Sequence, residues 1–206
     1  MNAKKLLYDP YNLIITGVGG QGNVMASRMI GDMLTRQGFN VTIGETFGAS
    51  QRGGSVMSHL RISMTGEHSP QIPLGRAHMI VSLEPTEALR VMCQYGNPDV
   101  KVITNTRPVQ SMSVISGAQA YPELETLKQR IQSFSKESWF LDTTKEAGRL
   151  GNPIFSNVII VGALSKTGDL PLDREAFEAV IRSRMASSKV ETNLNAFEIG
   201  GQIASV

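Results

Sequence analysis

The residues with the clearest chemical potential are the glycines within ITGVGGQGNVMASRM, residues 15 to 29. Gly17, Gly19 and Gly22 have the G-x-G-x-x-G spacing of a dinucleotide-binding turn, and Gly20 adds a further glycine to it. A backbone without Cβ atoms can approach a phosphate closely, and the N-terminus of a following helix offers free N–H groups. The segment therefore favours a phosphate or another anion as its ligand. The alternative is a tight turn that binds nothing.

A second group of candidate ligands follows the next expected strand. A dinucleotide site needs an acid at the end of that strand for the ribose hydroxyls, about 20 residues after the turn. Glu45 ends the strand later than this spacing requires, and an additional loop with Gln51, Arg52, Gly53 and Gly54 follows it. An arginine fork beside exposed amides suits a phosphate or a carboxylate, although a solvated surface loop explains Arg52 equally well. We expect this loop to lie near the glycine turn.

The remaining polar residues predict no catalytic group and no metal site. His59 lies in an alternating strand pattern that directs it outward, with no second histidine or cysteine nearby to complete a metal site. Ser50 and Ser55 lack the G-x-S-x-G elbow of a nucleophilic serine. Cys93 lies among apolar residues at helical spacing, which predicts a buried and unreactive thiol.

Alternating strands and helices must position these candidates. Strands are predicted from short apolar runs at 12–17, 39–45, 56–63, 78–84, 100–106 and 138–144. Helices are predicted from amphipathic runs at 23–38, 85–96, 122–134, 145–151, 156–168, 173–185 and 193–205, whereas 108–122 is ambiguous.

The order of these elements predicts the fold. The first strand, helix and strand indicate a crossover onto a parallel sheet, and 56–63 is expected to be half-exposed near a sheet edge. We expect residues 1–206 to form a single α/β domain. Its fold class is a three-layer α/β/α, Rossmann-like architecture with a mostly parallel sheet and helices added at the C-terminal end.

Composition narrows the class of partner. The 206 residues carry a formal net charge of only +2 and no run of lysine or arginine, which argues against nucleic acid. No segment has the roughly 20 apolar residues of a membrane span, and the N-terminus lacks a signal-peptide core, so a cytoplasmic protein is expected. The one cysteine excludes an intrachain disulfide and a self-contained four-cysteine cluster or zinc ribbon.

Longer motifs carry a family resemblance. GVGGQG at 17–22, followed by ETFGASQRGGSVMSHLR at 45–61, resembles the gamma subunits of the 2-oxoacid:ferredoxin oxidoreductases. GNPIFSNVIIVGAL at 151–164 and NLNAFEIG at 193–200 resemble the closing motifs of the same family. Within it, the sequence is most similar to the indolepyruvate enzymes, where this type of chain is called the beta subunit.

The resemblance implies a division of labour. In this family the holoenzyme decarboxylates a 2-oxoacid, passes electrons to ferredoxin and delivers the acyl group to coenzyme A, while thiamine diphosphate and Fe–S clusters lie on partner subunits. The chain would hold no cofactor alone, pack against the thiamine subunit in a hetero-oligomer, and help to bind coenzyme A as a co-substrate. The implied phosphate-facing residues are Gly17, Gly19, Gly20, Gln21 and Gly22. Residues implied to face the partner are Gln51, Arg52, Gly53 and Gly54, with Asn157 and Asn193 as weaker candidates.

Two other classes of function remain open from the residues. A stand-alone NAD(P)- or flavin-dependent reductase could use the same glycine turn, but it would need its own acid or base. A scaffold subunit with an empty turn would have no affinity for any nucleotide.

Overall fold

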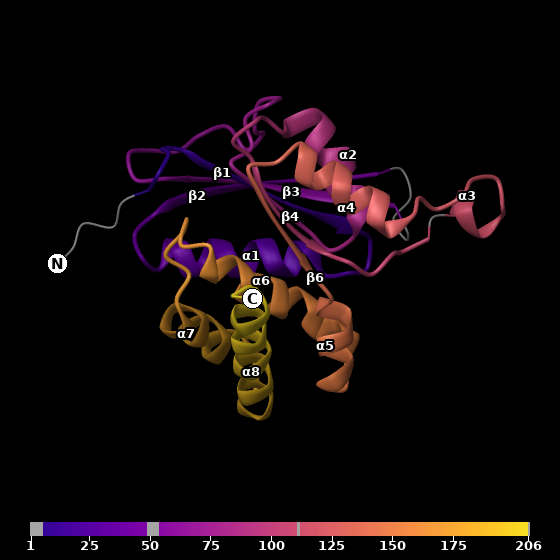
Figure 1. Ribbon diagram of the computed structural model, residues 1–206. Coiled ribbons are helices and arrows are strands. Elements are labelled where there is room, and N and C mark those ends of the chain that lie inside the picture. The colour runs from indigo at the N-terminus through magenta and orange to yellow at the C-terminus, as the bar shows by residue number, and fades with distance from the viewer. Residues whose placement is uncertain (1–5, 49–53, 111, 206) are drawn as a thin grey trace.

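The computed structural model of the chain describes residues 6–48, 54–110 and 112–205. Its centre is a six-stranded sheet with helices on both faces (Figure 1). The strands are β1 (Tyr11–Val18), β2 (Asn40–Phe47), β3 (Ser55–Ser63), β4 (Met79–Ser82), β5 (Lys101–Asn105) and β6 (Glu137–Leu141). The helices are α1 (Asn23–Thr35), α2 (Pro85–Tyr95), α3 (Met112–Ile115), α4 (Leu124–Ser133), α5 (Thr143–Arg149), the 3₁₀ turn η1 (Pro153–Phe155), α6 (Ser156–Lys166), α7 (Arg174–Arg184) and α8 (Ser187–Ile203).

The strand order is β2-β3-β1-β4-β5-β6. β1, β4, β5 and β6 are parallel neighbours, and β3 is antiparallel to both β1 and β2. Because β2 and β1 are both antiparallel to β3, they share one direction. The sheet is therefore mostly parallel, and the predicted α/β class is confirmed.

The position of β3 corrects two expectations. β2 does not pair with β1 after the first crossover, because β3 lies between them. β3 is also buried on both faces rather than half-exposed: Leu60 and Ile62 join the core on the α1 side, and Met57 joins the core on the other side. The alternation identified the two faces of the strand correctly, but it could not reveal that both are covered.

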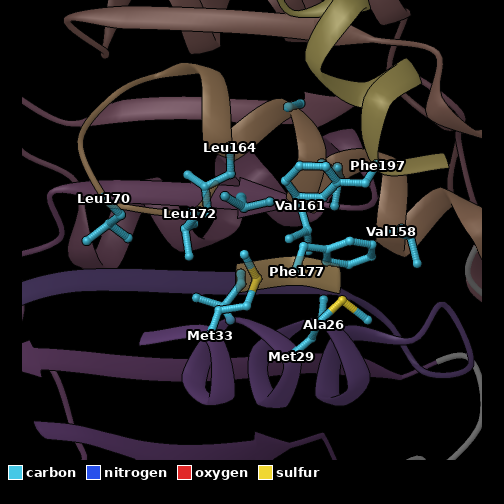
Figure 2. Close-up of a cluster of buried hydrophobic side chains, with 14 of the residues drawn as sticks. Ala26, Met29, Met33, Val158, Val161, Leu164, Leu170, Leu172, Phe177 and Phe197 are labelled. Carbon is cyan, nitrogen blue, oxygen red and sulfur yellow. The ribbon is translucent and has the colours of Figure 1, made fainter. Parts of the chain in front are cut away.

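One face of the sheet is covered by α1 and the C-terminal helices, which form a deeper stack below it in Figure 1. α6 packs between α1 and α8, and Phe177 of α7 stacks on Phe197 of α8 with ring centroids 4.4 Å apart. Figure 2 shows these rings beside Met29 and Met33 of α1 and Val161 of α6. The predicted C-terminal addition is thus an integral part of this core.

The opposite face is covered by α2 and α4 (Figure 1). α2 begins at Pro85, which suits the first helical turn, and the Glu84 carboxylate caps it by accepting from the Glu87 N–H. Val91, Met92 and Tyr95 face the sheet at helical spacing, which turns Cys93 outward. Cys93 is exposed, so the prediction of a buried thiol was wrong.

Within the described ranges, no helix is both long enough and apolar enough to cross a membrane.

Candidate functional site

The chain leaves the carboxyl ends of β1 and β4 in opposite directions. β1 continues through α1 towards β2 at one end of the sheet, whereas β4 continues through α2 to β5 on the other side. α1 and α2 cover opposite faces (Figure 1). In open α/β sheets, a crevice forms where neighbouring strands diverge in this way, and ligands bind there.

Two of the glycines in the turn after β1 have backbone angles that favour glycine. Gly20 has φ 100°, and Gly22, the N-cap of α1, has φ 88°. Gly17 is needed for a different reason: a Cβ there would lie 2.7 Å from both Asn23 Oδ1 and Gln21 Oε1. These glycines allow the chain to pass directly from a buried strand into the helix.

Gln21 braces the turn with its side-chain amide. Its Oε1 accepts a 2.7 Å hydrogen bond from the Val18 N–H, and its Nε2 donates a 2.8 Å bond to the Leu83 carbonyl after β4. The Gly19 N–H donates to the Gly54 carbonyl at 2.8 Å. Gly54 therefore lies against the glycine turn, as its place in the sequence predicts. The neighbouring candidates Gln51, Arg52 and Gly53 lie outside the described residues.

A cavity of about 850 Å³ opens at the carboxyl edge of the parallel strands. It is bounded by the glycine turn, by the chain after β5, and by the beginnings of α5, η1 and α6. The residues that line it are Gly20, Gln21, Arg107, Pro108, Val109, Gln110, Ile115, Thr144, Pro153, Ile154 and Ser156. Two of the five phosphate-facing candidates, Gly20 and Gln21, thus reach the cavity, while the other glycines shape the turn behind it.

Hydrogen bonds connect two lining residues of this cavity, Gln21 and Thr144, and we call the connected groups the floor of the cavity. The Leu83 carbonyl accepts from Gln21 Nε2 and, at 3.2 Å, from Asn105 Nδ2 at the end of β5. Asn105 Nδ2 also donates to Thr144 Oγ1 at 2.9 Å. The turn after β1 is thereby connected to the start of α5 across the ends of β4 and β5, so the polar groups of the floor have defined positions.

The electrostatics of the cavity favour an anion. Gly22, the N-cap residue of α1, provides no side-chain cap, so the first N–H groups of this helix have no side-chain acceptor. α6 instead continues the η1 turn: Asn152 caps that turn by accepting from the Ile154 N–H, and the Ser156 N–H donates to the Pro153 carbonyl. Arg107 is the single charged residue among the described residues that line the cavity, and no carboxylate in the described chain forms an ion pair with it. The turn that leads into the positive end of α1 and the Arg107 guanidinium therefore line one opening.

Sequence reasoning missed Arg107, Thr144 and Ser156 as residues of this cavity. A usable signal existed for the first two, because Arg107 directly follows the predicted strand 100–106 and Thr144 ends the predicted strand 138–144, and the carboxyl ends of parallel strands meet at one edge. Ser156 offers no such signal. It reaches the cavity at the start of a helix whose packing on α1 is decided by the fold.

Glu45 lies elsewhere. β3 separates its strand from β1, and its carboxylate forms a 3.6 Å ion pair with Arg28 of α1. In a dinucleotide fold the acid of the second strand is next to the glycine turn, because that strand is the neighbour of the first. The inserted strand removes this juxtaposition.

Asn157 and Asn193 are brought together at a separate, smaller cavity of about 280 Å³, which Met25 of α1 also lines. The Asn157 amide packs directly against Gly22, and Asn193 Nδ2 donates to the Lys189 carbonyl at 2.8 Å. Both side chains are buried. They support the helices behind the glycine turn and do not line the larger cavity.

His59 and Asp142, two further polar side chains, have partners within the fold. His59 is 2% exposed, contrary to the expectation that it points outward, and its Nδ1 accepts from the Ile72 N–H at 3.4 Å. Burial lowers the pKa of His59. Asp142 caps α5 by accepting from the Lys145 N–H. Among the residues that the structure describes, no cluster of three or more histidine, cysteine or acidic side chains could hold a metal ion.

Fold and site together define an α/β protein with an anion-suited cavity where its parallel strands diverge. Residues 12–203 match the family described as pyruvate ferredoxin/flavodoxin oxidoreductase. The chain belongs to this family.

Individual relatives agree with this assignment. The chain is 38% identical over 197 residues to the indolepyruvate oxidoreductase subunit IorB of Thermococcus kodakarensis, covering 94% of this chain and 96% of the relative. It is 28% identical over 191 residues to the 2-oxoglutarate synthase subunit KorC of Archaeoglobus fulgidus, covering 92% of this chain and 85% of the relative.

Solved structures show the same fold. Pyruvate oxidoreductase subunit PORC from Thermotoga maritima superposes with a TM-score of 0.70 at 18% identity, covering 95% of this chain and 97% of that chain. A 2-oxoglutarate:ferredoxin oxidoreductase from Magnetococcus marinus, with 2-oxoglutarate, coenzyme A and succinyl-CoA bound, gives a TM-score of 0.75 at 16% identity. That match covers 96% of this chain and 31% of the longer chain.

Proposed function

We propose that this chain is the gamma-type subunit of an indolepyruvate:ferredoxin oxidoreductase complex and that its carboxyl-edge cavity binds a phosphate group of coenzyme A. The reaction converts a 2-oxoacid and coenzyme A into an acyl-CoA and carbon dioxide, with release of a proton. A pair of electrons passes to ferredoxin. Similarity to IorB over nearly the full chain supports indolepyruvate as the 2-oxoacid.

The chemistry of electron transfer belongs to partner subunits in this proposal. An Fe–S cluster is held by several cysteine thiolates, and the chain has one cysteine. The cavity offers hydroxyl, amide and guanidinium groups, but none of its described lining residues is a histidine, aspartate or glutamate. The chain's own residues therefore bind and orient the coenzyme, while a partner subunit holds thiamine diphosphate.

The observation that carries the proposal is that Arg107 lines the same cavity as Gly20 and Gln21, which lead into the uncapped N-terminus of α1. A phosphate accepts hydrogen bonds from free helical N–H groups and from a guanidinium fork at the same time. Coenzyme A presents several phosphate groups and a thiol at the end of a flexible arm. A phosphate beside Gly20 would leave that arm free to reach the active centre of the partner.

The inserted strand β3 argues against NAD as the ligand of the glycine turn. With β3 between β1 and β2, no acid of the second strand is near the turn, and Glu45 is paired with Arg28 instead. Coenzyme A needs no such acid for a ribose diol, because its ribose carries a phosphate. A stand-alone NAD-dependent reductase is therefore the weaker candidate.

A matched pair of glycine variants tests the site in the assembled complex. Gly20 and Gly38 have φ values of 100° and 90°, and a Cβ at either position would meet nothing within 4 Å. Gly20→Leu and Gly38→Leu therefore impose similar backbone strain, but only Gly20→Leu places a side chain in the cavity. We expect Gly20→Leu to raise the KM for coenzyme A by about tenfold, equivalent to about 1.4 kcal/mol, with the KM for the 2-oxoacid unchanged.

A matched pair of arginine variants tests whether the cavity binds an anionic group of the coenzyme. Arg107→Gln should raise the KM for coenzyme A, whereas Arg76→Gln makes the same charge change before β4, at the opposite edge of the sheet. If Gly20→Leu and Arg107→Gln both leave the KM for coenzyme A at the value of their controls, the cavity is not the coenzyme site. The chain would then serve as a ligand-free scaffold subunit.

A further inference from the structure

A fully buried carboxylate lies beside the cavity without lining it. Glu84 follows β4, and its side chain is 0% exposed. One carboxylate oxygen, Oε2, caps α2 by accepting from the Glu87 N–H at 2.9 Å and from Thr86 Oγ1 at 2.5 Å. Oε2 therefore serves the helix cap, whereas the second oxygen, Oε1, takes no part in it.

Oε1 holds two points of the chain between β5 and α4. It accepts a 2.5 Å hydrogen bond from the Tyr121 hydroxyl and a 3.4 Å bond from the Val109 N–H. Burial, and then the hydrogen bond to Glu84 with its charge, raises the pKa of Tyr121. The phenol therefore stays protonated and remains a donor to this carboxylate.

The chain held by Oε1 includes the wall segment, which we define as residues 107–110. All four of its residues line the cavity, and Arg107 is among them. Beyond the wall segment, the chain runs out to α3, which projects from the body of the protein, and returns through Tyr121 to α4 (Figure 1). Two hydrogen bonds to Oε1, from Tyr121 at 2.5 Å and from Val109 at 3.4 Å, therefore anchor the two ends of a protruding stretch.

We propose that Glu84 is a positioning residue for coenzyme binding: its Oε1 latches Val109 and Tyr121 and so holds the wall segment, with Arg107, at the edge of the cavity. This inference rests on the proposed function. A carboxylate suits the role because it accepts on both oxygens, one for the helix cap and one for the latch. A glutamine could accept on one oxygen only.

The latch is separable from the helix cap by changing Tyr121. Tyr121→Phe removes the donor to Oε1 and leaves the bonds from Glu87 and Thr86 to Oε2 in place. Tyr11→Phe is the matched control, because the Tyr11 hydroxyl donates at 2.8 Å to another carboxylate, that of Asp169. Tyr11 lies at the start of β1, at the opposite edge of the sheet from the cavity.

The experiment measures two quantities for the assembled complex: amide hydrogen exchange across residues 107–121, and the KM for coenzyme A with kcat. We expect Tyr121→Phe to speed exchange at Val109 and its neighbours by about tenfold or more. It should raise the KM for coenzyme A by a similar factor at nearly unchanged kcat. Tyr11→Phe should change neither the exchange across residues 107–121 nor the KM for coenzyme A. Glu84→Gln should reproduce the Tyr121→Phe pattern if it folds.

Two results would overturn the latch. One is unchanged exchange in Tyr121→Phe, and the other is faster exchange with an unchanged KM in a complex whose Arg107→Gln variant has a raised KM. If Gly20→Leu and Arg107→Gln both leave the KM for coenzyme A unchanged, the proposed coenzyme site is what fails. The exchange measurement still decides in that case whether Glu84 holds the wall segment.

Discussion

Gly200 of α8 lies directly against the carbonyl oxygen of Ile159 in α6, so close that a Cβ on Gly200 would overlap it. Gly162 of α6 has the same relationship with the Phe197 carbonyl of α8. The two helices therefore cross with their backbones in contact, glycine against carbonyl in both directions. This crossing sets the position of α6, whose first residue, Ser156, lines the carboxyl-edge cavity.

The crossing predicts that alanine is destabilising at one helical glycine and tolerated at another. Gly162→Ala places a methyl group on the backbone of α8 and should lower the free energy of unfolding by about 1–3 kcal/mol or more. Gly148 in α5 is the control, because a Cβ there meets nothing within 4 Å. Gly148→Ala should raise stability by about 0.5–1 kcal/mol through its higher helix propensity. Urea unfolding of both variants is the measurement, and equal effects would contradict the crossing.

Lys101 is predicted to be worth more to stability than an ordinary surface lysine. Its Nζ lies 2.9 Å from Asp169 and 3.4 Å from Glu137, and its side chain is 17% exposed. Burial lowers the pKa of Lys101, but the hydrogen bond and charge of Asp169, with those of Glu137, outweigh it and raise the pKa overall.

Lys101→Met leaves the nearly buried Asp169 carboxylate without its cation and should cost on the order of 3 kcal/mol. Adding Asp169→Asn removes the stranded charge and should recover part of that loss. Denaturant midpoints of the single and double variants measure the coupling. A double variant less stable than Lys101→Met would show that the charge of Asp169 is not the cause.

Stability should fall on mild acidification because of two histidines. Burial lowers the pKa of His59, and burial with the nearby Arg76 lowers that of His78 against the opposing effect of Asp169. As the pH falls through about 6.5, these histidines therefore become protonated in the unfolded chain while they remain neutral in the folded chain. The free energy of unfolding is therefore full above about pH 6.5 and decreases as the pH falls towards the lowered pKa values, by at most about 1.4 kcal/mol per pH unit for each histidine.

His59→Asn separates this effect from other titrations, because the asparagine Oδ1 can accept from the Ile72 N–H without titrating. Below about pH 6.5, the free energy of unfolding of this variant should decrease less steeply with falling pH than that of the wild type. An identical pH dependence in the two proteins would remove His59 from the explanation.

Cys93 should react in the native protein. It is exposed on α2 and is the one cysteine of the sequence, so a thiol reagent should modify one equivalent without denaturant. Cys93→Ser should abolish that labelling and change the unfolding midpoint little, because no core contact is lost. Labelling that requires denaturant would restore the buried position expected from the helical pattern.

Local patterns were sufficient for much of the fold. The buried run of β1, the glycine turn and the spacing of α1 predicted a strand that passes directly into a helix, and the structure has that arrangement. The placement of Gly54 beside Gly19 also followed from the sequence. The loop that contains Gly54 follows the second strand, and strands that run in the same direction have their carboxyl ends at the same edge of the sheet. Such features depend on neighbours in the chain, so a window of residues contains the information.

The tertiary structure decided the features that depend on which distant segments pair. Insertion of β3 between β1 and β2 moved Glu45 away from the turn, and the cover of both faces buried His59. Arg107 and Ser156 meet at the cavity, and Tyr121 meets Glu84, only because strand order and helix crossings bring them together. A strand's own pattern specifies which residues share a face, but the partner beside it and the layer above it are chosen by the free energy of packing the whole core.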